Sequence, residues 1–135
     1  MKYLGAFVIS ALSLATTAWA AEWEFVTVSS SNTFIYIDKT SIKDVRDIFG
    51  PVKVAWFKKD ESNNKTVKYR ESKNLYHFKC ATSEMKLVQW VDYNADGSIF
   101  YSSGTNGYAS FSVAVPDSIG YAMLEAACFP QPADM

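Results

Sequence analysis

The chain has 135 residues, of which 49% are hydrophobic and 20% are charged, and its formal net charge is −1. The hydrophobic share is large enough to build a core and excludes a disordered chain. The balanced charge excludes a strongly basic nucleic-acid-binding protein and a polybasic membrane-surface protein, because both need an excess of Lys and Arg.

The first 20 residues have the pattern of a signal peptide. Lys2 gives a positive start, residues 4–15 are apolar or small, and Ala18-Trp19-Ala20 fits the site of a signal peptidase. The apolar run is shorter than the roughly 20 residues that span a bilayer. We therefore predict a signal peptide over residues 1–20, no membrane span, and a single exported domain over residues 21–135. The predicted cleavage site lacks a lipoprotein cysteine, so the expected location is the periplasm, the cell surface or the medium.

The first half of the exported domain is typical of β-strands. Residues 23–28 are aromatic and β-branched, and residues 33–38 alternate in polarity after a Ser-rich turn. Residues 40–48 are mixed, which predicts one helical turn or an irregular crossing. Residues 52–57 are a further strand, and residues 60–65 form a polar hairpin loop.

A long strand is expected over residues 66–80, but its pattern changes parity midway. Tyr69 lies on one face, whereas Tyr76 and Phe78 lie on the other. We expect a β-bulge near residues 73–74 to reconcile the two halves.

Further strands are expected at residues 85–93, 99–102 and 108–115. Asp96-Gly97 between the first two of these is typical of a tight hairpin turn. The strands follow one another through short connections, which predicts a meander.

A C-terminal helix is expected over residues 119–129, which are rich in Ala, Met and Leu. Asp117 or Ser118 can cap its first turn by accepting a hydrogen bond from a free backbone N–H. One helical face carries an apolar set: Tyr121, Leu124 and Cys128. The predicted fold is α+β, with an antiparallel meander of about six strands and this helix packed on one face.

Cys80 and Cys128 are the only two cysteines, and an even number in an exported chain favours one disulfide. In the predicted fold this disulfide links the helix to the sheet. A metal pair or a redox thiol is the alternative, but neither cysteine has a CxxC partner or a nearby His–Cys cluster.

Four segments, taken in their order, resemble a known family. They are Phe34-Ile35-Tyr36-Ile37-Asp38 with Ser41-Ile42, the strand ending in Cys80, the aromatic segment from Val88 to Gly97, and Val115-Pro116-Asp117-Ser118 leading to Ala126-Ala127-Cys128. The family is surface-adhesin protein E of Gram-negative bacteria, and the resemblance extends from Trp23 to Phe129. It implies a sheet with a C-terminal helix fastened by a disulfide. It also implies an exported protein that binds host extracellular-matrix glycoproteins and can form a homodimer.

The namesake members of the family are lipoproteins, and this chain has no lipobox cysteine. The alternative is therefore a soluble periplasmic envelope protein, with a structural, stress or inhibitor role and no host ligand.

Basic residues on neighbouring predicted strands suggest where a ligand binds. The residues that would form a basic stripe for an acidic, sulfated or glycoprotein ligand are Lys65, Lys68, Arg70, Lys73, Lys79 and Lys86, interleaved with Tyr69 and Tyr76. The predicted ligand contacts among them are Lys68, Arg70, Tyr76, Lys79 and Lys86. The alternative is a solvated sheet face on which lysines protect the edges.

The sequence contains no evident catalytic set. His77 is the only histidine, and no nucleophile motif accompanies it, so we expect a half-exposed strand residue. Asp92-Tyr93-Asn94-Ala95-Asp96-Gly97 matches the start of a calcium loop, but the twelfth position is Ser103 and the flanks are strands. We therefore predict no enzyme activity, no cofactor, no metal ion and no nucleic-acid partner.

Overall fold

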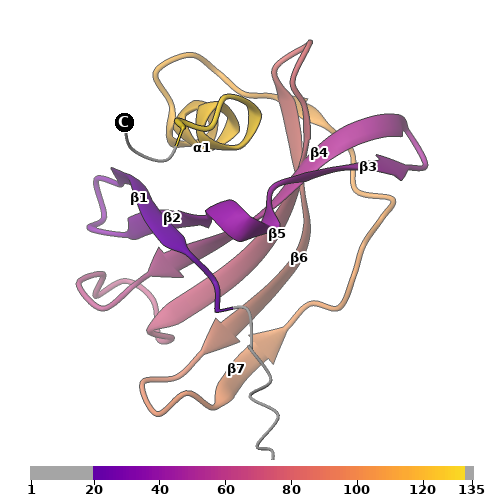
Figure 1. Ribbon diagram of the computed structural model, residues 1–135. Coiled ribbons are helices and arrows are strands. Elements are labelled where there is room, and N and C mark those ends of the chain that lie inside the picture. The colour runs from indigo at the N-terminus through magenta and orange to yellow at the C-terminus, as the bar shows by residue number, and fades with distance from the viewer. Residues whose placement is uncertain (1–19, 133–135) are drawn as a thin grey trace, which may run out of the picture.

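The computed structural model describes residues 20–132. The predicted signal peptide, residues 1–20, lies outside the described residues apart from Ala20. The described chain forms an eight-stranded antiparallel sheet with a helix on one face (Figure 1). In chain order the elements are β1 (Trp23–Val28), β2 (Phe34–Asp38), the 3-10 turn η1 (Lys39–Ser41), β3 (Lys43–Asp47), β4 (Gly50–Asp60), β5 (Glu71–Lys79), β6 (Glu84–Tyr93), β7 (Ile99–Ser102), β8 (Ser112–Val113) and α1 (Ile119–Cys128). Within residues 20–132, no helix is long and apolar enough to cross a membrane.

The main path of the sheet is a six-stranded meander in the order β1-β2-β4-β5-β6-β7. The two remaining strands pair outside this path, β3 with β4 and β8 with β6. β4, β5 and β6 are long central strands, and each outer edge is shared by two shorter ones. The predicted fold class is confirmed.

The turn η1 explains how β2 and β3 share one edge of β4. Asp38 ends β2, and its Oδ1 accepts hydrogen bonds from the backbone N–H and the hydroxyl of Thr40, at 3.0 Å and 2.7 Å. The turn then places the hydroxyl of Ser41 where it accepts a hydrogen bond from the backbone N–H of Trp56 at 2.8 Å. A side chain thus occupies the gap between the two short strands.

The helix α1 covers the apolar part of one sheet face. Its first turn is capped by Ser118, whose hydroxyl accepts a hydrogen bond from the backbone N–H of Tyr121 at 3.1 Å. The core holds apolar residues that alternate along the strands: Ile35, Ile37, Ala55, Phe57 and Phe78 from the sheet, with Met123, Leu124 and Ala127 from α1. The helix is therefore held by burial of its apolar face.

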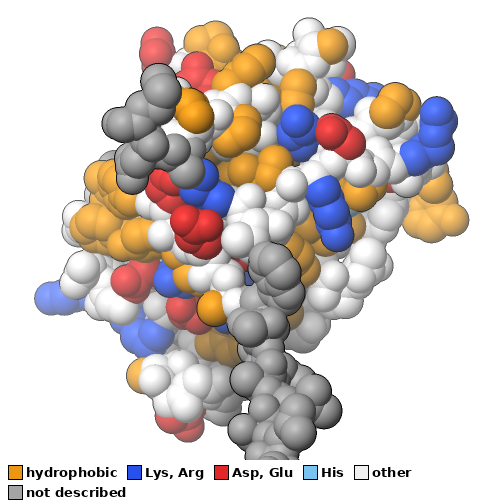
Figure 2. Space-filling model, in the orientation of Figure 1, with side chains coloured by type: hydrophobic (Ala, Val, Ile, Leu, Met, Phe, Trp, Pro, Cys, Tyr) orange, Lys and Arg blue, Asp and Glu red, His pale blue; other side chains and the backbone are white. Residues whose placement is uncertain are grey.

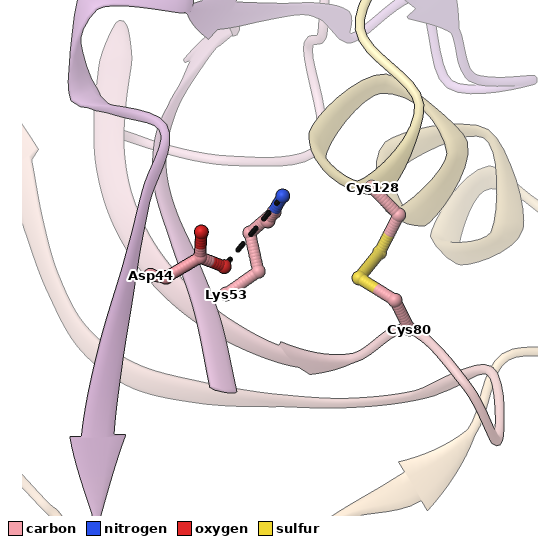
Figure 3. Close-up of a disulfide and its surroundings, with 4 residues drawn as sticks. All are labelled: Asp44, Lys53, Cys80 and Cys128. Carbon is pink, nitrogen blue, oxygen red and sulfur yellow. Dashed lines mark ion pairs between the residues drawn. A yellow bond between two sulfur atoms is a disulfide. The ribbon is translucent and has the colours of Figure 1, made fainter. Parts of the chain in front are cut away.

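The predicted disulfide is present. Cys128 is the last residue of α1, and Cys80 directly follows β5, with a Cα–Cα distance of 5.7 Å. Figure 3 shows the bond between the end of the helix and the sheet, beside the ion pair of Asp44 and Lys53. The bond joins the two layers of the fold covalently.

Two expectations about the strand predicted over residues 66–80, its start and the place of its bulge, are wrong. The strand predicted at 66–80 begins only at Glu71, because residues 61–70 fold into a loop of their own. The irregularity lies in β6 rather than at residues 73–74: Leu75 pairs with Gln89 and Tyr76 with Leu87, so Val88 is the extra residue.

The strand predicted at 108–115 is reduced to β8. Residues 103–111 instead follow the free edge of β6 as a loop. The backbone N–H groups of Ser103 and Asn106 donate to the carbonyls of Trp90 and Val88, at 3.0 Å and 2.8 Å. This loop covers the part of β6 that neither β7 nor β8 pairs with.

Candidate binding site

The residues predicted to form a basic stripe lie in separate places. Lys68 and Arg70 belong to the loop before β5, whereas Lys79 is the last residue of that strand, and the nine residues of β5 span about 30 Å. Tyr76 and Lys79 point to opposite faces of the sheet, because side chains alternate along a strand. Lys86 is buried. The continuous stripe is therefore wrong, and a ligand-binding role for these residues stays a prediction.

The exposed surface agrees with this distribution. Figure 2 shows Lys and Arg side chains interspersed with Asp and Glu on the visible face, with apolar side chains between them. The surface field on this face is therefore mixed rather than strongly positive.

The loop of residues 61–70 is braced from within. The guanidinium of Arg70 donates hydrogen bonds to the backbone carbonyls of Glu61 and Val67. The ring of Tyr69 packs 5.9 Å from the ring of Phe100 on β7. Arg70 thus braces the loop, whereas Lys68, the residue before Tyr69, is exposed.

Lys86 is the centre of a buried polar cluster. Its ammonium group lies 3.0 Å from Oδ2 of Asp47 and donates to the backbone carbonyl of Gly107 at 3.1 Å. His77 Nδ1 lies 2.9 Å from the same Oδ2, and the backbone N–H of Phe49 donates to Oδ1 at 2.7 Å. The side chain of Lys86 is 0% exposed and that of Asp47 is 10% exposed, so water screens this ion pair little.

Pairing of the strands explains how this cluster forms. Val54, His77 and Lys86 are cross-strand partners on β4, β5 and β6, so their side chains share the sheet face opposite to α1. The β3–β4 hairpin brings Asp47 against this row. His77 is therefore more buried than the sequence predicted, and its only hydrogen-bond partner among the described residues is Asp47.

Two phenylalanine rings cover the cluster. Phe49 comes from the β3–β4 turn and Phe111 precedes β8, and their ring centroids are 5.7 Å apart. The ammonium group of Lys86 lies 4.4 Å from the Phe49 centroid and 4.6 Å from that of Phe111. The ammonium group of Lys79 lies 4.4 Å from the Phe111 centroid. Lys79 and Lys86 are thus brought together, as cation–π partners of the same two rings.

The polar cluster around Lys86 makes the free energy of unfolding depend on pH. Burial alone would raise the pKa of Asp47, but hydrogen bonds from His77 and Lys86 outweigh it and hold this pKa below its ordinary value of 3.8. A lowered carboxyl pKa contributes stability that is present above pH 3.8 and is lost as the pH falls through the lowered pKa. We expect the free energy of unfolding to fall more between about pH 5 and about pH 3 in the natural protein than in Asp47→Asn, which lacks this titration. Urea unfolding at both pH values measures the difference, and equal losses would contradict the prediction.

A second polar group, on the opposite face of β5, was missed by the sequence analysis. Ser72 and Asn74 share the parity of Tyr76 and Phe78, so they point to the side of the sheet that α1 covers. Both are buried, and Nδ2 of Asn74 has no hydrogen-bond partner among the described residues. Polar residues at inward positions are the signal that would have identified them. Placing a bulge at residues 73–74 removed that signal.

The segment that matched a calcium loop in sequence forms the β6–β7 turn. The backbone N–H of Gly97 donates to the carbonyl of Asn94 at 3.0 Å, and that of Ser98 donates to the carboxylate of Asp96 at 2.9 Å. Across residues 20–132, no group of three or more His, Cys, Asp or Glu side chains is placed to hold a metal ion. The hairpin predicted from Asp96-Gly97 is confirmed.

Comparison with known proteins adds one finding. A family model described as surface-adhesin protein E matches residues 23–129. This segment contains all eight strands, both cysteines and α1. Comparisons with curated proteins and with solved structures found no match.

Proposed function

The chain belongs to the surface-adhesin protein E family, and on this premise we propose that it is an exported protein that binds host extracellular-matrix glycoproteins. The family match over residues 23–129 is the observation that carries the proposal. Non-enzymatic binding fits the position of the one histidine, His77, which lies in the buried cluster with Asp47 rather than on the surface.

The edge strand β7 is the surface best suited to a partner. β7 is last in the sheet order, and all four of its residues are exposed, including Ile99, Phe100 and Tyr101. Edge strands are normally protected by charged residues, proline or a covering segment, because their free backbone groups can pair with another chain. Exposed apolar residues that lie together mark interaction surfaces. We therefore place the binding surface on β7.

Lys68 supplies a positive charge beside this surface. It precedes Tyr69, whose ring packs on Phe100, so the exposed lysine lies next to β7. Of the other residues predicted to bind a ligand, Lys86 is buried, Arg70 braces its loop, and Tyr76 and Lys79 lie farther along β5. The proposed surface thus keeps Lys68 and adds the apolar residues of β7.

Immobilised laminin or vitronectin provides the test. We expect Lys68→Ala/Phe100→Ser to weaken binding by about 30-fold, the loss typical of one hot-spot residue. The matched control is Lys43→Ala/Phe25→Ser, which removes an exposed lysine and an exposed phenylalanine from the other side of the sheet. Binding should also weaken as salt concentration rises. Equal losses in the two variants, or no binding by the natural protein at physiological salt, would overturn the proposal.

Cell fractionation tests the location. A protein at the cell surface or in the medium can contact host matrix, whereas a protein confined to the periplasm cannot. Confinement to the periplasm would therefore overturn host binding and favour a role inside the envelope.

Light scattering on the purified protein tests the predicted homodimer, for which the open edge of β7 is the expected contact.

A further inference from the structure

We propose that a small polar cleft beside β7 binds one neutral sugar ring. The cleft has a volume of about 180 Å³ and is lined by residues of β4, β5, β6 and the loop before β5. This inference rests on the proposed function and names the ligand class that the surface would recognise on a glycoprotein.

The cleft lies where the hydrophobic core ends. Asn74 pairs with Phe57 on one side and Trp90 on the other, and cross-strand partners share a face of the sheet. The next row toward β7 is polar, with Ser72 paired to Asp92. Figure 1 shows α1 at the end of the sheet away from β7, so the helix leaves these rows uncovered.

Asn74 offers an unused hydrogen-bond donor. The residue is 3% exposed, and its Oδ1 accepts a hydrogen bond from the hydroxyl of Ser72 at 3.3 Å. Its Nδ2 has no acceptor among the described residues, although it is buried. Buried amide groups are nearly always paired, so an acceptor from outside the chain is the expected partner.

Asp92 offers the complementary acceptor. It is 7% exposed, and no described residue donates a hydrogen bond to its carboxylate. Lys59 also lines the cleft, with its ammonium group 3.5 Å from the hydroxyl of Tyr76. Asp92 and Tyr69 line the same cleft, and burial together with the charges of Asp92 and Glu61 raises the pKa of Tyr69.

Aromatic rings form the wall nearest β7. Trp90 lines the cleft, and its ring lies 6.0 Å from that of Tyr101 at an interplanar angle of 30°. Tyr69 lines the same hollow and packs on Phe100. An aromatic ring offers an apolar surface on which the C–H face of a sugar can pack.

These groups together fit a neutral sugar better than an anion. A sugar ring presents hydroxyl groups that accept from Asn74 and donate to Asp92, and its C–H face covers Trp90. A phosphate or sulfate would be repelled by Asp92, which offsets the charge of Lys59. The volume is below the ~300–1,000 Å³ of most small-molecule pockets, so one ring fits rather than an extended chain.

Nuclear magnetic resonance titration tests the binding. The probes are methyl β-galactoside, methyl α-mannoside and N-acetylglucosamine. We expect at least one of them to shift the Asn74 side-chain amide and Trp90 indole signals saturably, and Asn74→Val and Asp92→Asn to abolish the shift. Asn63→Val, at an exposed loop position, is the matched control and should keep it. No shift with any of the three sugars, or equal binding by Asn74→Val, overturns the proposal.

Thermal unfolding supplies a second readout. If Nδ2 of Asn74 has no partner within the chain, Asn74→Val in a Ser72→Ala background removes an unpaired buried donor without leaving the Ser72 hydroxyl unpaired. The double variant should then melt about 4 °C higher than Ser72→Ala alone without sugar. A lower melting temperature would mean that the amide has a structural partner, and it would overturn the inference.

Laminin binding separates this inference from the proposed function. Sugar recognition predicts that enzymatic removal of glycans from laminin reduces binding, and that Asn74→Val does the same. If both leave laminin binding unchanged, the sugar site is wrong and the proposed function stands. If the sugars bind but laminin does not, the proposed function fails and the cleft remains.

Discussion

Replacing both Cys80 and Cys128 with serine is expected to lower the free energy of unfolding by about 4 kcal/mol at most. The disulfide closes a loop with a sequence separation of 48 residues, and opening it returns that conformational freedom to the unfolded chain. A domain of this size has a total stability of about 5–15 kcal/mol, so the loss is a large share. The core contacts of Met123, Leu124 and Ala127 remain, so the helix should stay docked in the absence of denaturant.

Urea unfolding with and without a reductant measures this effect. The reduced natural protein and the double serine variant should unfold at the same urea concentration. This midpoint should lie well below that of the oxidised natural protein. The reductant should leave the double variant unchanged, which provides the internal control. Two free thiols in the native protein, or a midpoint that does not respond to reduction, would contradict the prediction.

Much of the fold could be predicted because the pattern of apolar residues within each segment indicates whether that segment is a strand or a helix. Residues 34–38 alternate and residues 119–128 carry an apolar face every three to four positions, and both became the expected elements. The hairpin at Asp96-Gly97 needed only two turn residues. Export and cysteine number then favoured the disulfide.

The polar clusters could not be found in the same way, because each depends on what lies over a face. Lys86 alternates with apolar residues as an exposed strand lysine would, and nothing near it in sequence indicates that the β3–β4 hairpin brings Asp47 against it. Asn74 was open to prediction, since parity alone puts it on the face of Phe78. Placing a bulge at residues 73–74, to reconcile the parity of Tyr69 with that of Tyr76 and Phe78, hid a buried side chain.

The predicted basic residues divide into lysines that are covered on a strand and a lysine that is exposed in a loop. A lysine on a strand is exposed only if no loop folds over its face, and Phe49 and Phe111 cover the face that holds Lys79 and Lys86. Lys68 lies in a loop and is exposed. Exposure, rather than charge, therefore selects Lys68 as a candidate contact for a partner.

Asp47→Ala is expected to lower the free energy of unfolding by about 3–5 kcal/mol, because it leaves Lys86 charged and buried without its counter-ion. Asp44→Ala is the matched control, since it removes the same group from the same strand. The Asp44 carboxylate is 85% exposed and lies 3.6 Å from Lys53, so its loss should change stability by less than about 1 kcal/mol. The unfolding midpoint in urea at neutral pH compares the two variants.

A paired variant shows whether the buried charge itself is the cause. Asp47→Ala/Lys86→Met removes both charges and keeps an unbranched side chain against Phe49 and Phe111, so it should be more stable than Asp47→Ala alone. Recovery of stability would assign the loss to the uncompensated ammonium group. If Asp47→Ala behaves like Asp44→Ala, Lys86 reaches water in solution, and the two rings do not seal this face of the sheet as the structure has them.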